Sequence, residues 1–180
     1  MSSIDELRDR FPEAAKDTKL NLDAVLRGES TLGHTERWLT ALAVTYALGH
    51  EELARAVDAE AKVAGVEEAV FDDARAVATL MAMNNVFYRF RHLVEKDSYQ
   101  SKPPRLRMNR MSQPKTNKIA FELASLAVSA VAGCSTCVQA HERTVVSGKG
   151  GGLTEDQVVD AIRIASVLTA AKTALFLSRS

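Results

Sequence analysis

Apolar residues recur every three or four positions along most of this chain of 180 residues. That spacing places them on one face of an α-helix. The same stretches are rich in Ala, Leu, Glu, Arg and Met, which are good helix formers. No Asn-Gly or Asp-Gly turn separates alternating segments of the kind that form hairpins. The pattern therefore predicts an all-α fold, with helices over residues 35–48, 51–63, 67–95, 115–132, 135–147 and 154–177.

Two of the expected helices begin with a capping box. Ser3 stands three residues before Glu6 at the start of a first short helix, and Thr154 stands three residues before Gln157. In each pair the two side chains can bond the free backbone N–H groups of the first turn. The glycine run at residues 150–152, just before the second box, predicts a flexible break.

An internal similarity indicates two related halves. Residues 42–45 (Leu-Ala-Val-Thr) and 126–129 (Leu-Ala-Val-Ser) lie 84 residues apart, and each is followed four residues later by a glycine, Gly49 or Gly133. The first copy has Trp38, His50, Leu53 and Val57 where the second has Glu122, Cys134, Cys137 and His141. Two Ala-rich helices can also resemble each other by chance. A genuine repeat would make one half a scaffold and give the chemistry to the other.

A basic segment separates these halves. Residues 102–118 hold six Lys and Arg, three Pro and no acid. We interpret the segment as an extended, solvated connection, with docking of an acidic partner or a symmetry mate as the alternative. The expected organisation is one domain over residues 1–180: a degenerate N-terminal half (1–100), a basic connection (101–118) and a C-terminal half that carries the chemistry (119–180).

Composition narrows the class of protein. With 23 basic and 23 acidic residues the formal charge is zero, which gives no reason to expect nucleic acid as the main partner. No run of 18 apolar residues predicts a membrane span. The first residues do not combine a cationic start with an apolar run, so we expect no secretory signal and a cytoplasmic location.

The two cysteines, Cys134 and Cys137, form a single C-x-x-C motif. In a cytosolic protein this spacing predicts redox or metal chemistry. Because Gly133 ends the preceding apolar helix, the pair falls in the first turn of a new one, where free N–H groups and a partial positive charge favour a thiolate. His141 lies one turn beyond Cys137 on the same face. Its imidazole can take the thiol proton directly or through one water.

Glu122 is the only acidic residue between Lys115 and Cys137. If its helix packs antiparallel to the cysteine helix, the carboxylate can approach His141 and orient the imidazole, giving a carboxylate–imidazole–thiol relay. A surface position near the start of its helix is the alternative for Glu122.

Two other interpretations of the cysteines stay open at this point. A C-x-x-C pair can be half of a structural zinc site, which usually needs four ligands. Here His141 is the only obvious third ligand, with Glu122 or a distant histidine as the fourth. Buried cysteines without chemistry are also common in helical cores.

The stretch from Glu122 to His141, E-x11-C-S-x-C-x3-H, resembles the alkyl hydroperoxidase D (AhpD) family, part of the carboxymuconolactone decarboxylase-like superfamily. Residues 16–22 and 83–89 are similar to the narrower subgroup, and the likeness extends over nearly the whole chain. The resemblance implies an all-helical protomer built from two similar halves and usually assembled as a homotrimer.

The same resemblance implies reduction of alkyl hydroperoxides and hydrogen peroxide. Cys137 would attack the peroxide and become a sulfenic acid, and Cys134 would form the internal disulfide and exchange with partners. His141 and Glu122 would form the proton relay. Electrons would come from dihydrolipoamide on a lipoylated dehydrogenase-complex component, and ultimately from NADH through dihydrolipoamide dehydrogenase. The protein would also reduce a peroxiredoxin of the alkyl hydroperoxide reductase C type, and it would hold no bound cofactor or metal.

One position departs from the family pattern. Some members have histidine just before the second cysteine, where this chain has Thr136, and this puts the rate in doubt more than the reaction type. Three other functions are alternatives: a decarboxylase acting on a muconolactone, which would not need two cysteines; a disulfide-exchange adaptor with little peroxidase activity; and a zinc-binding helical module.

Overall fold

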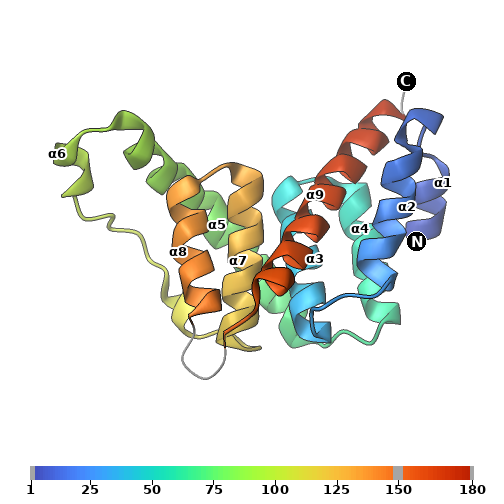
Figure 1. Cartoon of the computed structure of the whole chain (residues 1–180), viewed down its shortest axis with the longest axis horizontal. Coiled ribbons are helices and arrows are strands. Elements are labelled where there is room, and N and C mark those ends of the chain that lie inside the picture. The colour runs from blue at the N-terminus through green and yellow to red at the C-terminus, as the bar shows by residue number, and fades with distance from the viewer. Residues whose placement is uncertain (1–2, 148–151, 179–180) are drawn as a thin grey trace.

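The computed structural model describes residues 3–147 and 152–178. Within those ranges the chain forms nine α-helices, two short 3₁₀ helices (η) and no strand, which confirms the all-α prediction (Figure 1). The elements are α1 (Ile4–Asp9), η1 (Glu13–Ala15), α2 (Lys16–Arg27), α3 (His34–Leu48), α4 (Glu51–Val63), α5 (Glu68–Val94), α6 (Asp97–Gln100), η2 (Asn109–Ser112), α7 (Lys118–Ala132), α8 (Ser135–Val146) and α9 (Glu155–Leu177). None of these helices is long and apolar enough to cross a membrane.

Most helix boundaries agree with the sequence pattern. Both capping boxes are present, at Ser3 and at Thr154. The predicted start of α7 at residue 115 is wrong by three residues, because Asn117 caps this helix by accepting a hydrogen bond from the backbone N–H of Ala120 at 2.8 Å. Helix α2 was not predicted. Of the glycine run before α9, residues 150 and 151 lie outside the described residues.

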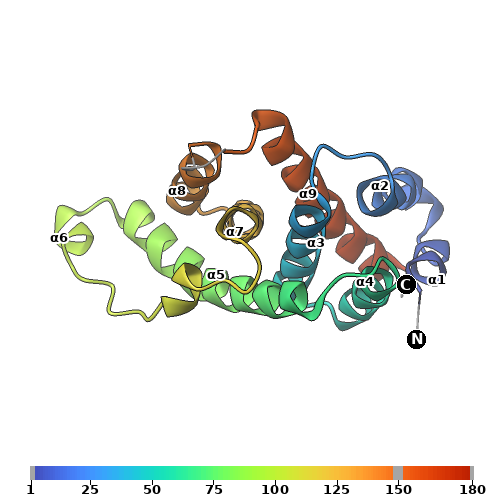
Figure 2. The ribbon, with the colours of Figure 1, turned by 90° about the horizontal axis from the view of Figure 1, so that it is seen from below.

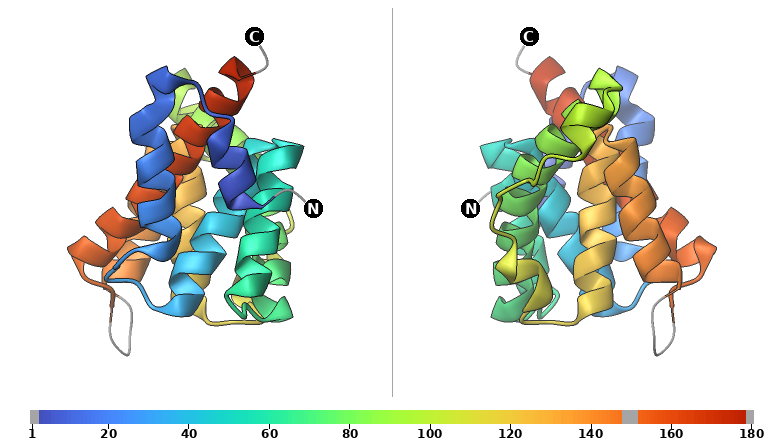
Figure 3. Two further views of the ribbon diagram at one scale, coloured as in Figure 1. Left: turned by 90° about the vertical axis from the view of Figure 1, so that its right-hand side faces the viewer. Right: turned by 90° about the vertical axis from the view of Figure 1, so that its left-hand side faces the viewer.

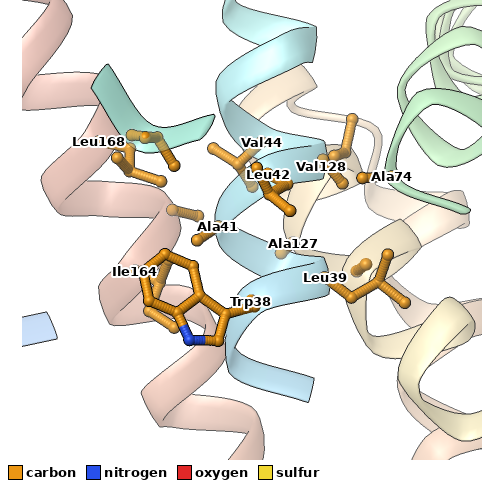
Figure 4. Close-up of a cluster of buried hydrophobic side chains, with 14 of the residues drawn as sticks. Trp38, Leu39, Ala41, Leu42, Val44, Ala74, Ala127, Val128, Ile164 and Leu168 are labelled. Carbon is orange, nitrogen blue, oxygen red and sulfur yellow. The ribbon is translucent and has the colours of Figure 1, made fainter. Parts of the chain in front are cut away.

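Helices α3 and α7 form the centre of the molecule and pack against each other, with α9 on one side and α5 on the other (Figure 2). Every residue of α3 from Trp38 to Thr45 is buried, as expected for a helix covered on all sides. Figure 4 shows Trp38 packed beside Ile164 of α9 in this core. In the aligned halves Trp38 occupies the position of Glu122, so the first half has apolar packing where the second has a carboxylate.

The turns that end α3 and α7 have the same construction. Gly49 and Gly133 both adopt the left-handed conformation, with φ of 66° and 68°. The next residue caps the following helix in each case: the His50 ring accepts from the N–H three residues later at 3.3 Å, and the Cys134 sulfur does the same at 3.4 Å. The order helix, left-handed glycine, capping side chain and helix therefore occurs twice, 84 residues apart.

The ends of the two central helices are also held in a matching way. The last carbonyl of α3, on Leu48, accepts a hydrogen bond from Lys172 of α9 at 2.8 Å. The last carbonyl of α7, on Ala132, accepts one from Arg89 of α5. Each half therefore supplies a cation to the helix end of the other half, where the helix dipole favours positive charge. The division at residues 1–100, 101–118 and 119–180 stays a prediction.

The basic connection is anchored more firmly than a solvated linker. Asp73 of α5 is fully buried. Its carboxylate accepts hydrogen bonds from the Arg110 guanidinium at 2.5 Å, from the backbone of Lys115 at 3.0 Å, and from the Thr116 backbone and hydroxyl at 2.8 and 2.7 Å. None of residues 102–118 is buried, so the segment is solvated as expected, but its C-terminal end is also fixed to the helical core. The anchored residues lie directly before Asn117, so Asp73 fixes where α7 begins.

Candidate active site

The α7–α8 hairpin brings together residues that are far apart along the chain. The right-hand view of Figure 3 shows α7 and α8 side by side, with α5 next to them. Helix α7 ends at Ala132, Gly133 reverses the chain, and α8 begins after Cys134. Glu122 on α7 and His141 on α8 can meet because this two-residue connection folds the helices back on each other.

Cys134 and Cys137 form a disulfide across the first turn of α8, with their Cα atoms 5.3 Å apart. Cys134 is the N-cap residue, as the position of Gly133 predicts. Both cysteines are buried: Cys134 has no exposed surface and Cys137 is 6% exposed. Exchange with a partner requires an accessible disulfide, and in this conformation the sulfur of Cys134 is instead turned inward, toward the backbone N–H of Cys137.

Glu122 and His141 form a buried pair. The Nδ1 atom of His141 lies 2.5 Å from Oε2 of Glu122, and the two residues are 8% and 5% exposed. The contact predicted between antiparallel helices is present, and the alternative of a surface position for Glu122 is wrong. Within the described residues no hydrogen bond joins the His141 ring to either sulfur, although His141 lies one turn after Cys137 on the same helix.

A third charged residue, Lys118, holds the same carboxylate. Its Nζ atom lies 2.5 Å from Oε1 of Glu122 and also donates to the backbone carbonyl of Met111 at 2.7 Å. Burial raises the pKa of Glu122, but hydrogen bonds from His141 and Lys118 outweigh it, so the pKa lies below its ordinary value. Sequence reasoning placed Lys118 in the basic connection and in the predicted helix over residues 115–132, but gave it no role at the site. Its position four residues before Glu122 is the signal that was available.

Helix α5 supports the back of the hairpin through residues of the 83–89 stretch. The side-chain oxygen of Asn85 accepts from the Ser129 hydroxyl at 2.9 Å, and Arg89 donates to the Ala132 carbonyl. Both contacts lie in the last turn of α7, directly before Gly133 and Cys134. The role of Arg89 at the helix end was not expected from the sequence.

The residues that the structure describes contain no group of three or more His, Cys, Asp or Glu side chains placed to hold a metal ion. The chemical elements of the site are a disulfide at a helix N-terminus, an imidazole on the same helix and a carboxylate bonded to that imidazole. A histidine bonded to a carboxylate, on the helix that carries a cysteine pair, is an arrangement that a helical thiol–disulfide protein can use.

Comparisons with known proteins narrow this class. Residues 99–178 match the model of the Carboxymuconolactone decarboxylase family. The chain is 54% identical over 178 residues to a protein named alkyl hydroperoxide reductase AhpD from Anaeromyxobacter sp. (strain K), covering 99% of this chain and 93% of the relative. A protein of the same name from Maricaulis maris (strain MCS10) is 43% identical over 168 residues, covering 93% and 94%. One from Brucella canis (strain ATCC 23365 / NCTC 10854 / RM-666) is 39% identical over 173 residues, covering 96% of each chain. The chain therefore belongs to the AhpD family, within the carboxymuconolactone decarboxylase-like superfamily.

Proposed function

We propose that this protein is a thiol peroxidase that reduces alkyl hydroperoxides and hydrogen peroxide through Cys134 and Cys137. The observation that carries the proposal is the buried 2.5 Å contact between Glu122 and His141, one helical turn from Cys137. The name alkyl hydroperoxide reductase, which relatives covering nearly the whole chain carry, supports it.

In the first chemical step His141 takes the proton of the Cys137 thiol, with Glu122 holding the imidazole in place. The thiolate attacks the terminal oxygen of the hydroperoxide, an S–O bond forms and the O–O bond breaks. The alkoxide that leaves takes the proton from His141 and departs as an alcohol. Cys137 is thereby oxidised to a sulfenic acid, and the peroxide is reduced by two electrons.

In the second step the Cys134 thiol attacks the sulfenic acid sulfur, which releases water and forms the disulfide. Dihydrolipoamide then reduces this disulfide to two thiols and becomes the cyclic disulfide, with NADH restoring it through dihydrolipoamide dehydrogenase. We also propose that the reduced Cys134–Cys137 pair can pass its two electrons to a peroxiredoxin of the alkyl hydroperoxide reductase C type instead of to a peroxide. Since both cysteines are buried, we propose that the first turn of α8 loosens to admit the reductant.

We further propose that the protein acts in the cytoplasm as a homotrimer. The C-terminal part of α5 and α6 extends away from the central helices (Figure 1). Exposed apolar residues recur there at helical spacing: Val86, Phe90 and Leu93. Phe90 also packs edge-on against Tyr99 of α6, and the exposed surface of the stripe supports burial against a second copy of the chain. Sedimentation equilibrium tests the trimer, and Phe90→Glu should weaken it.

Trapping of the sulfenic acid tests the chemistry. Cys134→Ser treated with one equivalent of hydroperoxide should leave a sulfenic acid on Cys137 that dimedone labels, because no second thiol remains to condense with it. Cys137→Ser is the matched control and should give no label. Label on Cys134 in that control, with none on Cys137 in the first variant, would reverse the assignment of the attacking thiol.

A further inference from the structure

The position of Lys118 conflicts with the simplest electrostatics of its helix. It is the first residue of α7, where the helix dipole disfavours a cation and where no acidic residue occupies the first turn. Its ammonium group nevertheless reaches Oε1 of Glu122 at 2.5 Å and the carbonyl of Met111 at 2.7 Å. Glu122 thus has both oxygens occupied, one by Lys118 and the other by His141.

We propose that Lys118 is a positioning residue for the cysteine chemistry: it fixes the Glu122 carboxylate, ionised, against His141, and so sets the pH at which Cys137 becomes a thiolate. This inference rests on the proposed function, since it needs the relay from Glu122 through His141 to Cys137. Met111 of η2 helps to hold Lys118 in place, because its backbone carbonyl accepts a hydrogen bond from the same ammonium group.

Several charged groups on the elements packed against α7 are bonded elsewhere. From α5, Asp73 is bonded to the connection, and Arg89 bonds to the far end of α7 at Ala132. From η2, Arg110 pairs with Asp72 and Asp73. The α3 residues buried in the core are apolar or threonine, and Lys172 of α9 is bonded to Leu48. His141 from α8 and Lys118 from α7 itself are the charged groups that act on Glu122.

The sign of the effect follows from charge alone. Glu122, His141 and Cys137 exchange protons as a coupled set. Removing a positive charge beside that set makes every proton in it harder to remove. Because the Lys118 side chain is 47% exposed, solvent screens its charge, and the loss is expected to move the midpoint of Cys137 upward by about half a pH unit to one unit.

The test measures the alkylation rate of Cys137 by iodoacetamide as a function of pH, in reduced protein carrying Cys134→Ser so that Cys137 is the only thiol. In this background Lys118→Met should raise the midpoint, and Lys118→Arg should restore it by keeping the charge. Lys115→Met is the matched control. It removes the same charge from the same connection, but the ammonium group of Lys115 pairs with Asp72, at 3.2 Å, and not with Glu122. Lys118 and Lys115 side chains are comparably exposed, at 47% and 60%.

Three results would overturn the proposal. The first is an unmoved midpoint in Lys118→Met, and the second is an equal shift in Lys115→Met. The third is a shift of equal size when Lys118→Met is made in a Glu122→Gln background, because a residue acting through Glu122 must lose its effect there. The alkylation assay needs no peroxide turnover. Absence of peroxide turnover in the wild-type protein would therefore contradict the proposed function, while the alkylation assay would still measure the effect of Lys118 on Cys137.

Discussion

Asp73 offers a quantitative test of how the connection is attached to the helical core. Its Oδ1 atom accepts from Arg110 and from the Lys115 backbone, and its Oδ2 atom accepts twice from Thr116. In Asp73→Asn one of these oxygens becomes an amide NH2 group. With the NH2 group in the place of Oδ1, Arg110 and the Lys115 N–H both lose their acceptor. With it in the place of Oδ2, only the Thr116 N–H does, because the Thr116 hydroxyl can turn and accept from the amide. The second orientation is therefore favoured, and it leaves one donor facing another.

A hydrogen bond to a charged group contributes about 1.5–3 kcal/mol, so one lost bond, together with loss of the charge that strengthens the remaining ones, is expected to cost about 2–4 kcal/mol at this fully buried site. For a chain of this length that corresponds to a fall in Tm of about 10 °C. Urea unfolding followed by circular dichroism measures the change. The slope of the free energy of unfolding against urea concentration should stay the same if the variant exposes the same surface area when it unfolds.

Asp72→Asn is the matched control. Asp72 is the preceding residue and pairs with the same Arg110, but its side chain is 37% exposed, whereas that of Asp73 has no exposed surface. Exposed ion pairs contribute less than about 1 kcal/mol, so this substitution should change the free energy of unfolding little. Equal losses in the two variants would refute the reasoning, because burial of Asp73 would then play no part.

Three further outcomes are expected. Glu122→Gln should slow peroxide reduction about 100-fold in stopped-flow measurements while the fold is retained, since the carboxylate orients the proton acceptor; an unchanged rate at every pH contradicts the relay. Gly133→Ala and Gly49→Ala should each cost about 1 kcal/mol of stability, because both positions have positive φ and open space around the added Cβ, but only Gly133→Ala should lower the rate. A similar loss of rate in both would show that the turn before Cys134 has no special role. Asp160→Ala should cost about 1–2 kcal/mol at neutral pH. Burial raises the pKa of Asp160, but hydrogen bonds led by those from Thr31 lower it to about 2, so its stabilisation is present above about pH 4 and is lost as the pH falls toward 2. The difference between this variant and the wild type in urea unfolding should therefore shrink between pH 4 and pH 2, and a constant difference would argue against the assignment.

The sequence allowed most helices to be predicted because their signals are local. The bounds of α4 agree with the prediction at both ends. The signals that define this helix are local: His50 caps its first turn, and apolar residues follow at helical spacing. Helix α2 was missed because its buried side is narrow. Only Leu22 and Leu26 are buried there, while Leu20 is exposed, so the apolar period is weak. The start of α7 has a local signal, the N-cap residue Asn117, that the prediction did not use. The hydrogen bonds that hold the preceding residues to Asp73, more than 40 residues earlier, have none.

The site divides in the same way. The relation of Cys134, Cys137 and His141 follows from helical spacing on a single element. The contact of Glu122 with His141 required a correct guess about how α7 packs on α8. Arg89 at the end of α7 depends on the register between α5 and α7, which helical periodicity does not determine. Lys118 lies between these cases, because its spacing from Glu122 is local but its ion pair depends on the buried position of that carboxylate.

The most direct test of the central claim is hydroperoxide-driven consumption of NADH in a mixture of dihydrolipoamide dehydrogenase, lipoamide and this protein. The account predicts turnover that depends on the protein and is abolished in Cys137→Ser. Absence of turnover, with the Cys134–Cys137 disulfide still reduced by dihydrolipoamide, would contradict it and would identify the protein as an adaptor that passes electrons to a separate peroxidase.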